Sequence, residues 1–286
     1  FRSFLDGGAY GSYGIATTYY TGVLQPVTYK LPAYKFEGMR LFTNKPPCGP
    51  KRGHGTTQPR YAVEVHMDKI AHDLGIDPLE LRRRNLVEPY TRTVNGLRIT
   101  SCALDECLDK VVERSGWHEF HIAVNADGID QSPIKCGMGL AASTYICGAG
   151  KPIYWNDLPH SAVQIRLDRG GGVTVYCGAT DIGQGSTSIL AYIVAEELGI
   201  EPEHIHLETA DTTLTPVDLG SYSSRVTFMA GNAAIVAARA LKDQLFEAVS
   251  EKLHVPAARL TAEGGVICDE DDASVMLPFT TAVQLT

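Results

Sequence analysis

The chain lacks the closely spaced cysteines that either a disulfide framework or an iron–sulfur cluster would require. It has seven cysteines, an odd number, and no CxxC pair among its 286 residues. This usage suits reduced thiols in a cytoplasm better than disulfide bonds. Because iron–sulfur clusters are held by several neighbouring thiolates, we expect none to be bound by this chain.

Long apolar runs are also missing. No stretch reaches the roughly 18 uninterrupted apolar residues that a transmembrane helix needs, so no membrane span is expected. The chain begins at Phe1 rather than Met and shows no basic segment followed by an apolar run, so no signal peptide is expected. We therefore expect a cytoplasmic chain that is an internal piece of a longer protein.

Positive charge is scarce. Lys and Arg number 25 against 33 Asp and Glu, which gives a net charge of −8 and a sequence pI of about 5.6. No basic run exceeds the triplet at 82–84, which follows helix-forming residues and indicates the solvated side of a helix. A nucleic-acid partner is not expected, because a surface that follows phosphates needs clustered positive charge.

Length and composition fit a globular chain of two lobes. Domains usually have roughly 100–150 residues, and the content of 44% hydrophobic and 20% charged residues is ordinary. Polar sequence with Gly, Asp and Asn at 115–133 indicates a link between the lobes. We expect the first lobe at 1–118 and the second at 119–286.

Periodicity predicts an α+β fold of mixed sheets packed by helices. The first forty residues are expected to be extended, with strand-forming residues at 17–29. Apolar spacing predicts a helix at 59–74 that is capped by Gly75, and Asp77 begins a capping box. The later pattern predicts a hairpin of 162–167 and 173–177, a helix at 186–198, a strand at 204–210 and a long helix that carries Leu241 to Leu253.

Three loops rich in glycine and hydroxyl residues each lead into a predicted helix. They are residues 52–58, 178–187 and 220–227. A helix N-terminus exposes unpaired N–H groups and a partial positive charge, so each loop could bind a phosphate or another anion. Such loops are also common in folds that bind nothing, and it is their joint presence that favours a binding site.

The order of these segments resembles the molybdopterin-binding large subunit of the xanthine oxidase family. Residues 46–55 resemble the family's loop that ends in Arg-Gly-Phe-Gly, and residues 181–185 resemble its Gly-Gln-Gly loop. Residues 211–234 resemble a later cofactor segment. The resemblance extends to about residue 240 and implies the two-lobed molybdopterin-binding fold of the xanthine oxidase and aldehyde oxidase type.

The resemblance implies a molybdenum held by the dithiolene of a pterin, which in bacterial members usually carries a cytosine dinucleotide. Gln184 would hydrogen-bond the metal centre, and Arg52 would lie beside the cofactor. Ser223, Ser224 and Arg225 would approach the pterin or its diphosphate through charge-assisted hydrogen bonds, although a surface ion pair is the alternative for the arginine. The cofactor-binding residues implied in this way are Arg52, Gly53, Gly183, Gln184, Gly185, Ser224 and Arg225.

The substrate pocket that the resemblance implies contains Tyr20, His54 and Ser223. His54 replaces the family's usual Phe, and Tyr20 falls where xanthine oxidases carry an arginine. Both suit the type called 4-hydroxybenzoyl-CoA reductase, which removes a phenolic hydroxyl from an aromatic CoA thioester, because both can donate protons to an electron-rich ring. Alternatively, His54 only fixes its own loop.

The resemblance also implies partner subunits. Iron–sulfur clusters and FAD would be bound by those subunits and not by this chain, in a hetero-oligomer such as a dimer of heterotrimers. Two other interpretations stay open. The first is a molybdenum hydroxylase or dehydrogenase of the aldehyde or xanthine type, acting on a small aromatic or aldehyde substrate. The second is a non-catalytic module that retains the fold.

No catalytic residue is expected within this chain. The family's glutamate for proton handling is expected beyond Thr286, since no Gly-x-Gly-Glu segment occurs here. His204 and His206 would share one strand face without a third ligand, so no metal site is expected from protein side chains either. We therefore expect the isolated chain to bind cofactor poorly and to be inactive.

Overall fold

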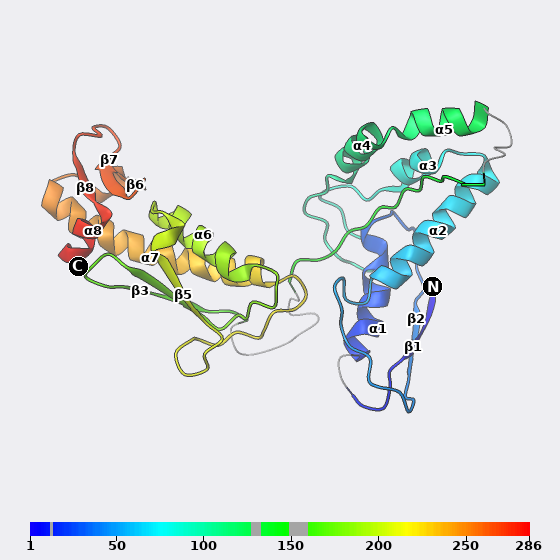
Figure 1. Cartoon of the computed structure of the whole chain (residues 1–286), viewed down its shortest axis with the longest axis horizontal. Coiled ribbons are helices and arrows are strands. Elements are labelled where there is room, and N and C mark those ends of the chain that lie inside the picture. Colours follow the sequence, from blue (N-terminus) through cyan, green and yellow to red (C-terminus); the bar gives the residue numbers. More distant parts are fainter. Residues whose placement is uncertain (12–13, 127–132, 149–159) are drawn as a thin grey trace. The chain divides into compact units, whose positions relative to one another are not determined.

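The computed structural model describes residues 1–11, 14–126, 133–148 and 160–286. It consists of two compact units, unit 1 at Phe1–Tyr145 and unit 2 at Ile146–Thr286, each with its own hydrophobic core (Figure 1). The contacts thus divide the chain after Tyr145, later than the lobe boundary expected after residue 118. That boundary concerns the cofactor-binding lobes and stays a prediction. None of the helices in the described ranges combines the length and apolar character that crossing a bilayer requires.

Unit 1 begins with two parallel strands. β1 (Arg2–Asp6) pairs with β2 (Glu37–Leu41), and the segment between them holds α1 (Gly14–Val23) and the short 3-10 helix η1 (Gln25–Val27). Parallel strands need a crossover connection, which is usually helical. The expectation of extended structure over the first forty residues is therefore wrong for residues 14–23.

Tertiary packing explains why α1 is helical despite its strand-forming residues. The hydroxyl of the buried Thr21 donates to the carbonyls of Thr17 and Gly55 at 2.9 and 2.8 Å. A Cβ on Gly22 would lie 2.1 Å from Cδ1 of Phe36, so the helix backbone lies directly against that ring. Such contacts override strand propensity, which depends strongly on context.

The predicted pair of helices after residue 57 is confirmed as α2 (Thr57–Leu74) and α3 (Pro78–Asn85). Gly75 ends α2 in a left-handed conformation with φ of 65°. The Asp77 carboxylate accepts hydrogen bonds from two N–H groups in the first turn of α3, at 2.7 and 3.2 Å. The side chain of Glu80 pairs with an arginine at 2.6 Å instead of returning to Asp77, so only half of the capping box forms.

The expected polar link at 115–133 is in part a helix. α4 (Leu104–Ser115) is followed directly by α5 (Trp117–Ala126). Trp117 is buried with apolar residues of α4 in the core of unit 1, so its indole ties the start of α5 to that core. The expectation of a link is wrong for 117–126, and residues 127–132 lie outside the described part of the chain.

A buried ion pair joins α2 to α3. Arg82 is 0% exposed, and its Nε donates to Oε2 of Glu64 at 2.8 Å. Glu64 also accepts hydrogen bonds from the Tyr29 hydroxyl at 2.8 Å and from the Ala142 N–H at 3.0 Å. The prediction of a solvated triplet at 82–84 is therefore wrong for Arg82, because a guanidinium can be buried when it is paired and hydrogen-bonded.

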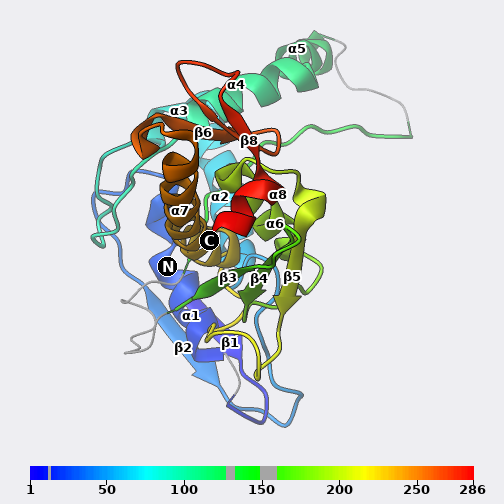
Figure 2. The ribbon, with the colours of Figure 1, turned by 90° about the vertical axis from the view of Figure 1, so that its left-hand side faces the viewer.

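Unit 2 is built on a three-stranded sheet. β3 (Val163–Leu167) pairs antiparallel with β4 (Val173–Cys177), and β5 (Ile205–Thr209) runs parallel to β4. α6 (Ser186–Leu198) and α7 (Val226–Leu253) pack against each other, α6 also contacts β5, and α7 also contacts β3 (Figure 2). These elements confirm the predicted hairpin, helix, strand and long helix.

Small residues allow α6 and α7 to approach closely. Ala230, Gly231, Ala234 and Ala238 of α7 are buried at the core of unit 2. A Cβ on Gly231 would lie 3.0 Å from Cδ1 of Ile193 on α6, which is tighter than ordinary van der Waals contact. This tight core supports the two loops that precede α6 and α7.

The remainder of unit 2 is a small antiparallel sheet with short helical segments. Its elements are β6 (Leu260–Glu263), β7 (Val266–Asp269), β8 (Met276–Pro278) and α8 (Phe279–Ala282), and the 3-10 helices of the unit are η2 (Pro202–His204), η3 (Ala257–Arg259) and η4 (Val283–Leu285). Together the two units have the predicted α+β fold of mixed sheets packed by helices.

The buried pair in unit 1 leads to a stability prediction. Glu64→Ala is expected to lower the free energy of unfolding of unit 1 by about 3–5 kcal/mol. It removes the buried carboxylate that Arg82, Tyr29 and Ala142 N–H share, and it leaves the guanidinium only its pair with Asp68, which is 47% exposed. Glu80→Ala is the matched control, because it removes an exposed pair with Arg84 and should cost at most about 0.5 kcal/mol. Chemical denaturation of both variants measures the difference. Equal losses would contradict the importance of the buried pair.

Candidate functional site

Two of the three predicted anion-binding loops lie side by side in unit 2. We name the first the Gln184 loop, residues 178–187. The second was predicted at 220–227, but α7 already begins at Val226, so we define the serine loop as residues 218–225. The Ser221 hydroxyl donates a hydrogen bond to the Thr180 carbonyl and so joins one loop to the other. The Gln184 loop leads into α6 and the serine loop leads into α7. Segments about 40 residues apart in sequence therefore form one surface.

The Gln184 loop is shaped by the carboxylate of Asp181, for which the sequence predicted no role of its own. Oδ1 of Asp181 accepts hydrogen bonds from the N–H groups of Gly183 and Gly185 at 2.8 and 3.4 Å, and Oδ2 accepts one from Thr187 N at 3.3 Å. These bonds, with that of Gly183 the strongest, hold the pKa of Asp181 below its ordinary value of 3.8. The two glycine N–H groups thus point into the loop.

The Gln184 side chain is exposed but folds back on its own loop. Its Nε2 donates to the Thr180 carbonyl at 3.1 Å and to the Ser186 hydroxyl at 2.9 Å, and its Oε1 accepts from the Ile182 N–H at 2.6 Å. A contact between Gln184 and a cofactor would therefore require the amide to exchange these partners. The cofactor role of Gln184 stays a prediction.

The outer face of the Gln184 loop is open. Gly183 and Gly185 have φ of 100° and 78°, and no described atom beyond their chain neighbours lies within 4 Å of where their Cβ atoms would be. Only glycine adopts such a backbone readily, and the missing side chains leave room for a flat group against the backbone. This shape fits the predicted pterin.

The serine loop brings hydroxyl groups to the start of a long helix. Ser223 and Ser224 both have left-handed backbones, with φ of 49° and 51°. They directly precede α7, whose first turn has no side-chain cap. Ser224 is exposed and Ser223 is half-buried. Hydroxyl donors beside an uncapped helix N-terminus suit phosphate oxygens, so both serines remain candidates.

Arg225 lies inside the unit rather than at its surface. Its side chain is 0% exposed and pairs with Asp218, also 0% exposed, at 2.8 Å between Nη1 and Oδ1. All its N–H directions are used by described partners of the protein. Both expectations for it, a direct phosphate contact and a surface ion pair, therefore need correction. Arg225 holds the serine loop from within.

The third loop belongs to unit 1 and contains Arg52 and Gly53. Among the described residues, the exposed Arg52 guanidinium has neither a hydrogen bond nor an ion pair, so it is available to an anion. Gly53 has φ of 77°, and its carbonyl accepts hydrogen bonds from the hydroxyl and the N–H of Thr56, at 2.8 and 3.0 Å. The turn is thereby fixed just before α2 begins at Thr57.

His54 and Tyr20 are brought together, as their predicted pocket requires. Their ring centroids lie 5.1 Å apart, and Nε2 of His54 is 2.7 Å from Oγ1 of Thr17. Burial lowers the pKa of His54 below its ordinary value of 6.5, so the imidazole is neutral at neutral pH. Tyr20, however, is 1% exposed, and only a side-chain movement would bring it to a substrate. His54 is thus the more accessible of the two.

Each unit therefore contributes one cluster of predicted site residues. Unit 1 gathers Tyr20, His54 and the loop of Arg52, and unit 2 gathers Gln184 with the serine loop. That both clusters surround one cofactor stays a prediction.

Sequence reasoning missed Asp181 and Asp218. The position of Asp181, two residues before Gly183, is a usable turn signal, whereas nothing in the sequence indicates that Asp218 is buried.

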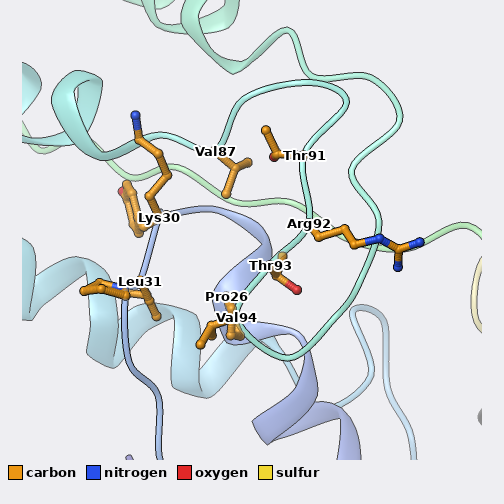
Figure 3. Close-up of a pocket in the computed structure, with 10 residues that line it drawn as sticks. Pro26, Lys30, Leu31, Val87, Thr91, Arg92, Thr93 and Val94 are labelled. Atoms are coloured by element: carbon orange, nitrogen blue, oxygen red, sulfur yellow. The ribbon is translucent and has the colours of Figure 1, made fainter.

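Two cavities occur in the described part of unit 1. The larger, about 550 Å³, is lined by residues that include Gly53, Thr57 and Arg60, so it adjoins the Arg52 loop. The smaller, about 380 Å³, is lined by none of the predicted site residues. In Figure 3 the charged ends of its Lys30 and Arg92 extend in different directions, so they do not form one anion site.

Comparison with known proteins identifies relatives of the whole chain. Two family models, both described as molybdopterin cofactor-binding domain, match residues 1–86 and 110–285. A xanthine dehydrogenase molybdenum-binding subunit of Escherichia coli O157:H7 is 32% identical over 262 residues, which cover 91% of this chain and 34% of that protein. The carbon monoxide dehydrogenase large chain of Hydrogenophaga pseudoflava is 30% identical over 271 residues, which cover 90% and 32%.

A solved structure shows the same fold. Quinoline 2-oxidoreductase from Pseudomonas putida 86 superposes with a TM-score of 0.82 at 24% sequence identity, covering 99% of this chain and 37% of that one. The chain thus spans about a third of the length of the relatives that it matches.

The carboxylate of Asp181 generates a prediction for the Gln184 loop. Asp181→Ala is expected to raise amide hydrogen exchange at 183–187 about tenfold or more, because the N–H groups lose a charged acceptor whose hydrogen bonds contribute about 1.5–3 kcal/mol. In the unsubstituted chain the loop should stay protected above the ordinary pKa of 3.8. Protection should be lost as pH falls through the lower pKa of the folded state. Protection unchanged by the substitution would contradict this assignment, and Asp168→Ala, in another turn, is the control.

Proposed function

This chain belongs to the molybdopterin-binding family of the xanthine oxidase type, and from that premise we propose that it forms part of a molybdenum-dependent oxidoreductase. The observation that carries the proposal is the surface shared by the Gln184 loop and the serine loop. It combines an open glycine backbone, serine hydroxyls and an uncapped helix start. These features suit a large, flat and anionic cofactor.

The cofactor is proposed to be held by exposed groups of both units. Gly183 and Gly185 would let the pterin lie against the backbone, and Ser224 would donate to its phosphates. Arg52 would supply a positive charge that no described partner neutralises. When bound, the molybdenum centre exchanges two electrons with a substrate, and water is the source or sink of oxygen. We propose the cytosine dinucleotide form of the cofactor, because its phosphates could be bound by the Ser224 hydroxyl and the Arg52 guanidinium.

Electron transfer partners follow from the same proposal. The relatives are described as a molybdenum-binding subunit and a large chain, which supports a multi-subunit enzyme. We propose that iron–sulfur clusters and FAD are held by partner subunits in a hetero-oligomer. The odd set of free cysteines without a CxxC pair is consistent with the absence of such a cluster from this chain.

The reaction that the relatives favour is oxidation of a small molecule. Two of them are named as dehydrogenases of xanthine and carbon monoxide, and the solved structure is that of a quinoline oxidoreductase. We therefore propose a hydroxylase or dehydrogenase acting on an aldehyde, a purine or another N-heterocycle. A neutral His54 beside the Arg52 loop would then contact the substrate as a hydrogen-bonding group, where the family usually has an aromatic ring.

A second candidate is the reductive removal of a phenolic hydroxyl, as in 4-hydroxybenzoyl-CoA reductase. In that reaction two electrons and two protons convert 4-hydroxybenzoyl-CoA to benzoyl-CoA and water. The observation in favour is His54 itself, which is partly exposed and could deliver a proton to the ring or to the leaving hydroxyl. The burial of Tyr20 weakens this candidate, because only one of the two expected donors is accessible.

Metal and pterin analysis tests the proposed cofactor. The whole protein that contains this chain is expected to purify with molybdenum and pterin in a one-to-one ratio to the subunit. Arg52→Ala should weaken retention of the cofactor by about tenfold or more, because a charge-assisted hydrogen bond contributes about 1.5–3 kcal/mol. Lys51→Ala, which removes a neighbouring exposed charge, should have little effect. Absence of both molybdenum and pterin would support a non-catalytic module instead.

A substitution of His54 separates the two reactions. If His54 donates a proton, His54→Phe in the whole enzyme should lower reduction of 4-hydroxybenzoyl-CoA by about a hundredfold or more. The same change restores the family's usual residue and should preserve or raise turnover of an aldehyde or N-heterocycle. Steady-state rates with both substrate classes provide the measurement. Turnover of aldehydes or N-heterocycles alone, by the unsubstituted enzyme, would reject the reductase candidate.

A further inference from the structure

We propose that the buried ion pair between Asp218 and Arg225 positions both cofactor loops of unit 2. This inference rests on the proposed function, because it assigns the pair a role toward the cofactor. Neither side chain touches the outer surface: both are 0% exposed, and their atoms Oδ1 and Nη1 are 2.8 Å apart. The two residues are therefore positioning residues and not ligands.

The guanidinium of Arg225 connects three parts of the chain. Nη1 donates to Asp218 and, at 2.6 Å, to the Gly220 carbonyl. Nη2 donates to the Ser161 hydroxyl at 2.7 Å and to the His160 carbonyl. These partners precede β3 on one side and form the first half of the serine loop on the other. The planar, five-donor geometry of arginine is what allows one side chain to reach all of them.

Asp218 extends this network to the Gln184 loop. A Cβ on Gly178, at the start of that loop, would lie 3.0 Å from Cβ of Asp218 and 2.5 Å from the Pro216 carbonyl oxygen. The backbone before Asp218 therefore packs directly against the first residue of the Gln184 loop. The Asp218 carboxylate also accepts hydrogen bonds from the Ser161 hydroxyl and, at 2.8 Å, from Gly220 N–H. The buried pair thus contacts both loops on their interior side.

The serine loop needs such a constraint because its backbone is unfavourable by itself. Ser223 and Ser224, which immediately precede Arg225, are consecutive left-handed residues that lack glycine's freedom. A hydrogen bond from Gly148 N–H to the Ser223 carbonyl, 2.9 Å long, helps to hold this backbone. It involves Ser223 and not Ser224. The ion pair anchors both ends of the segment, at 218 and at 225. The positions of the serine hydroxyls therefore depend on it.

Unit 2 offers a matched control pair. Arg259 donates to Asp269 at 3.1 and 2.6 Å, and the carboxylate is again buried, with 5% of its side chain exposed. This pair joins η3 to the end of β7 and contacts neither cofactor loop. If Asp218 only stabilised the fold, Asp218→Asn and Asp269→Asn would both lower the unfolding midpoint, the latter by less because Arg259 is 44% exposed, and neither would change the loops. If Asp218 positions the loops, only its substitution should raise amide exchange in the loops and lower the cofactor content.

The experiment compares Asp218→Asn, Arg225→Lys and Asp269→Asn in the whole protein that contains this chain. Three quantities are measured: the thermal unfolding midpoint, amide hydrogen exchange at 180–187 and 220–226, and molybdenum and pterin per folded subunit. Asp218→Asn and Arg225→Lys are expected to raise exchange in both loops at least tenfold and to lower cofactor content severalfold. Asp269→Asn is expected to lower the midpoint without changing either loop or the cofactor content.

The possible outcomes distinguish this inference from the proposed function. Cofactor missing from the unsubstituted protein would overturn the proposed function. Cofactor present there and unchanged in Asp218→Asn, with unchanged loop exchange, would overturn only the inference, as would equal cofactor loss in Asp269→Asn. If Asp218→Asn and Arg225→Lys do not fold, Asp218→Glu decides, since it keeps the charge of the carboxylate and changes only the geometry of the pair. It should raise exchange in the serine loop, and unchanged exchange there would overturn the inference.

Discussion

The arrangement of the candidate site in unit 2 depends on a charged group that is kept out of water. A buried guanidinium is costly unless it is paired and its N–H groups are occupied. Arg225 meets that requirement by drawing together His160, Ser161, Asp218 and Gly220. Because these partners come from separate segments, satisfying one side chain fixes the course of the loops. The exposed serines and glycines then acquire a defined position without forming strong contacts themselves.

Unit 1 applies the same constraint to its own architecture. Arg82 is buried between α2 and α3, where Glu64 also binds Tyr29 and the backbone at Ala142. This network stabilises the helix that begins directly after the Arg52 loop. In unit 2 the buried arginine contacts the loop itself, and in unit 1 it stabilises the helix that follows the loop. Exposed groups such as Arg52 and Ser224 can then bind a ligand, while buried residues hold the backbone in place, as a cofactor site requires.

The sequence predicted those parts of the fold that follow from local periodicity and turn chemistry. The hairpin of β3 and β4, the helices α2, α3, α6 and α7, and the cap at Gly75 are confirmed for this reason. α1 was missed because contacts such as Gly22 against Phe36 override strand-forming residues. For the site, motifs identified the loops but not their supports. Burial of Arg82 and Arg225 depends on partners remote in sequence, which spacing alone does not reveal.

We propose that loops of both units hold one molybdenum cofactor. An experimental structure of the whole protein with its cofactor tests it most directly, through the position of the pterin relative to Arg52, the Gln184 loop and Ser224. One bound cofactor is expected, in contact with the guanidinium of Arg52, the open face at Gly183 and Gly185, and the hydroxyl of Ser224. A cofactor bound elsewhere, with Arg52 and Ser224 on surfaces that do not share a cleft, would contradict it.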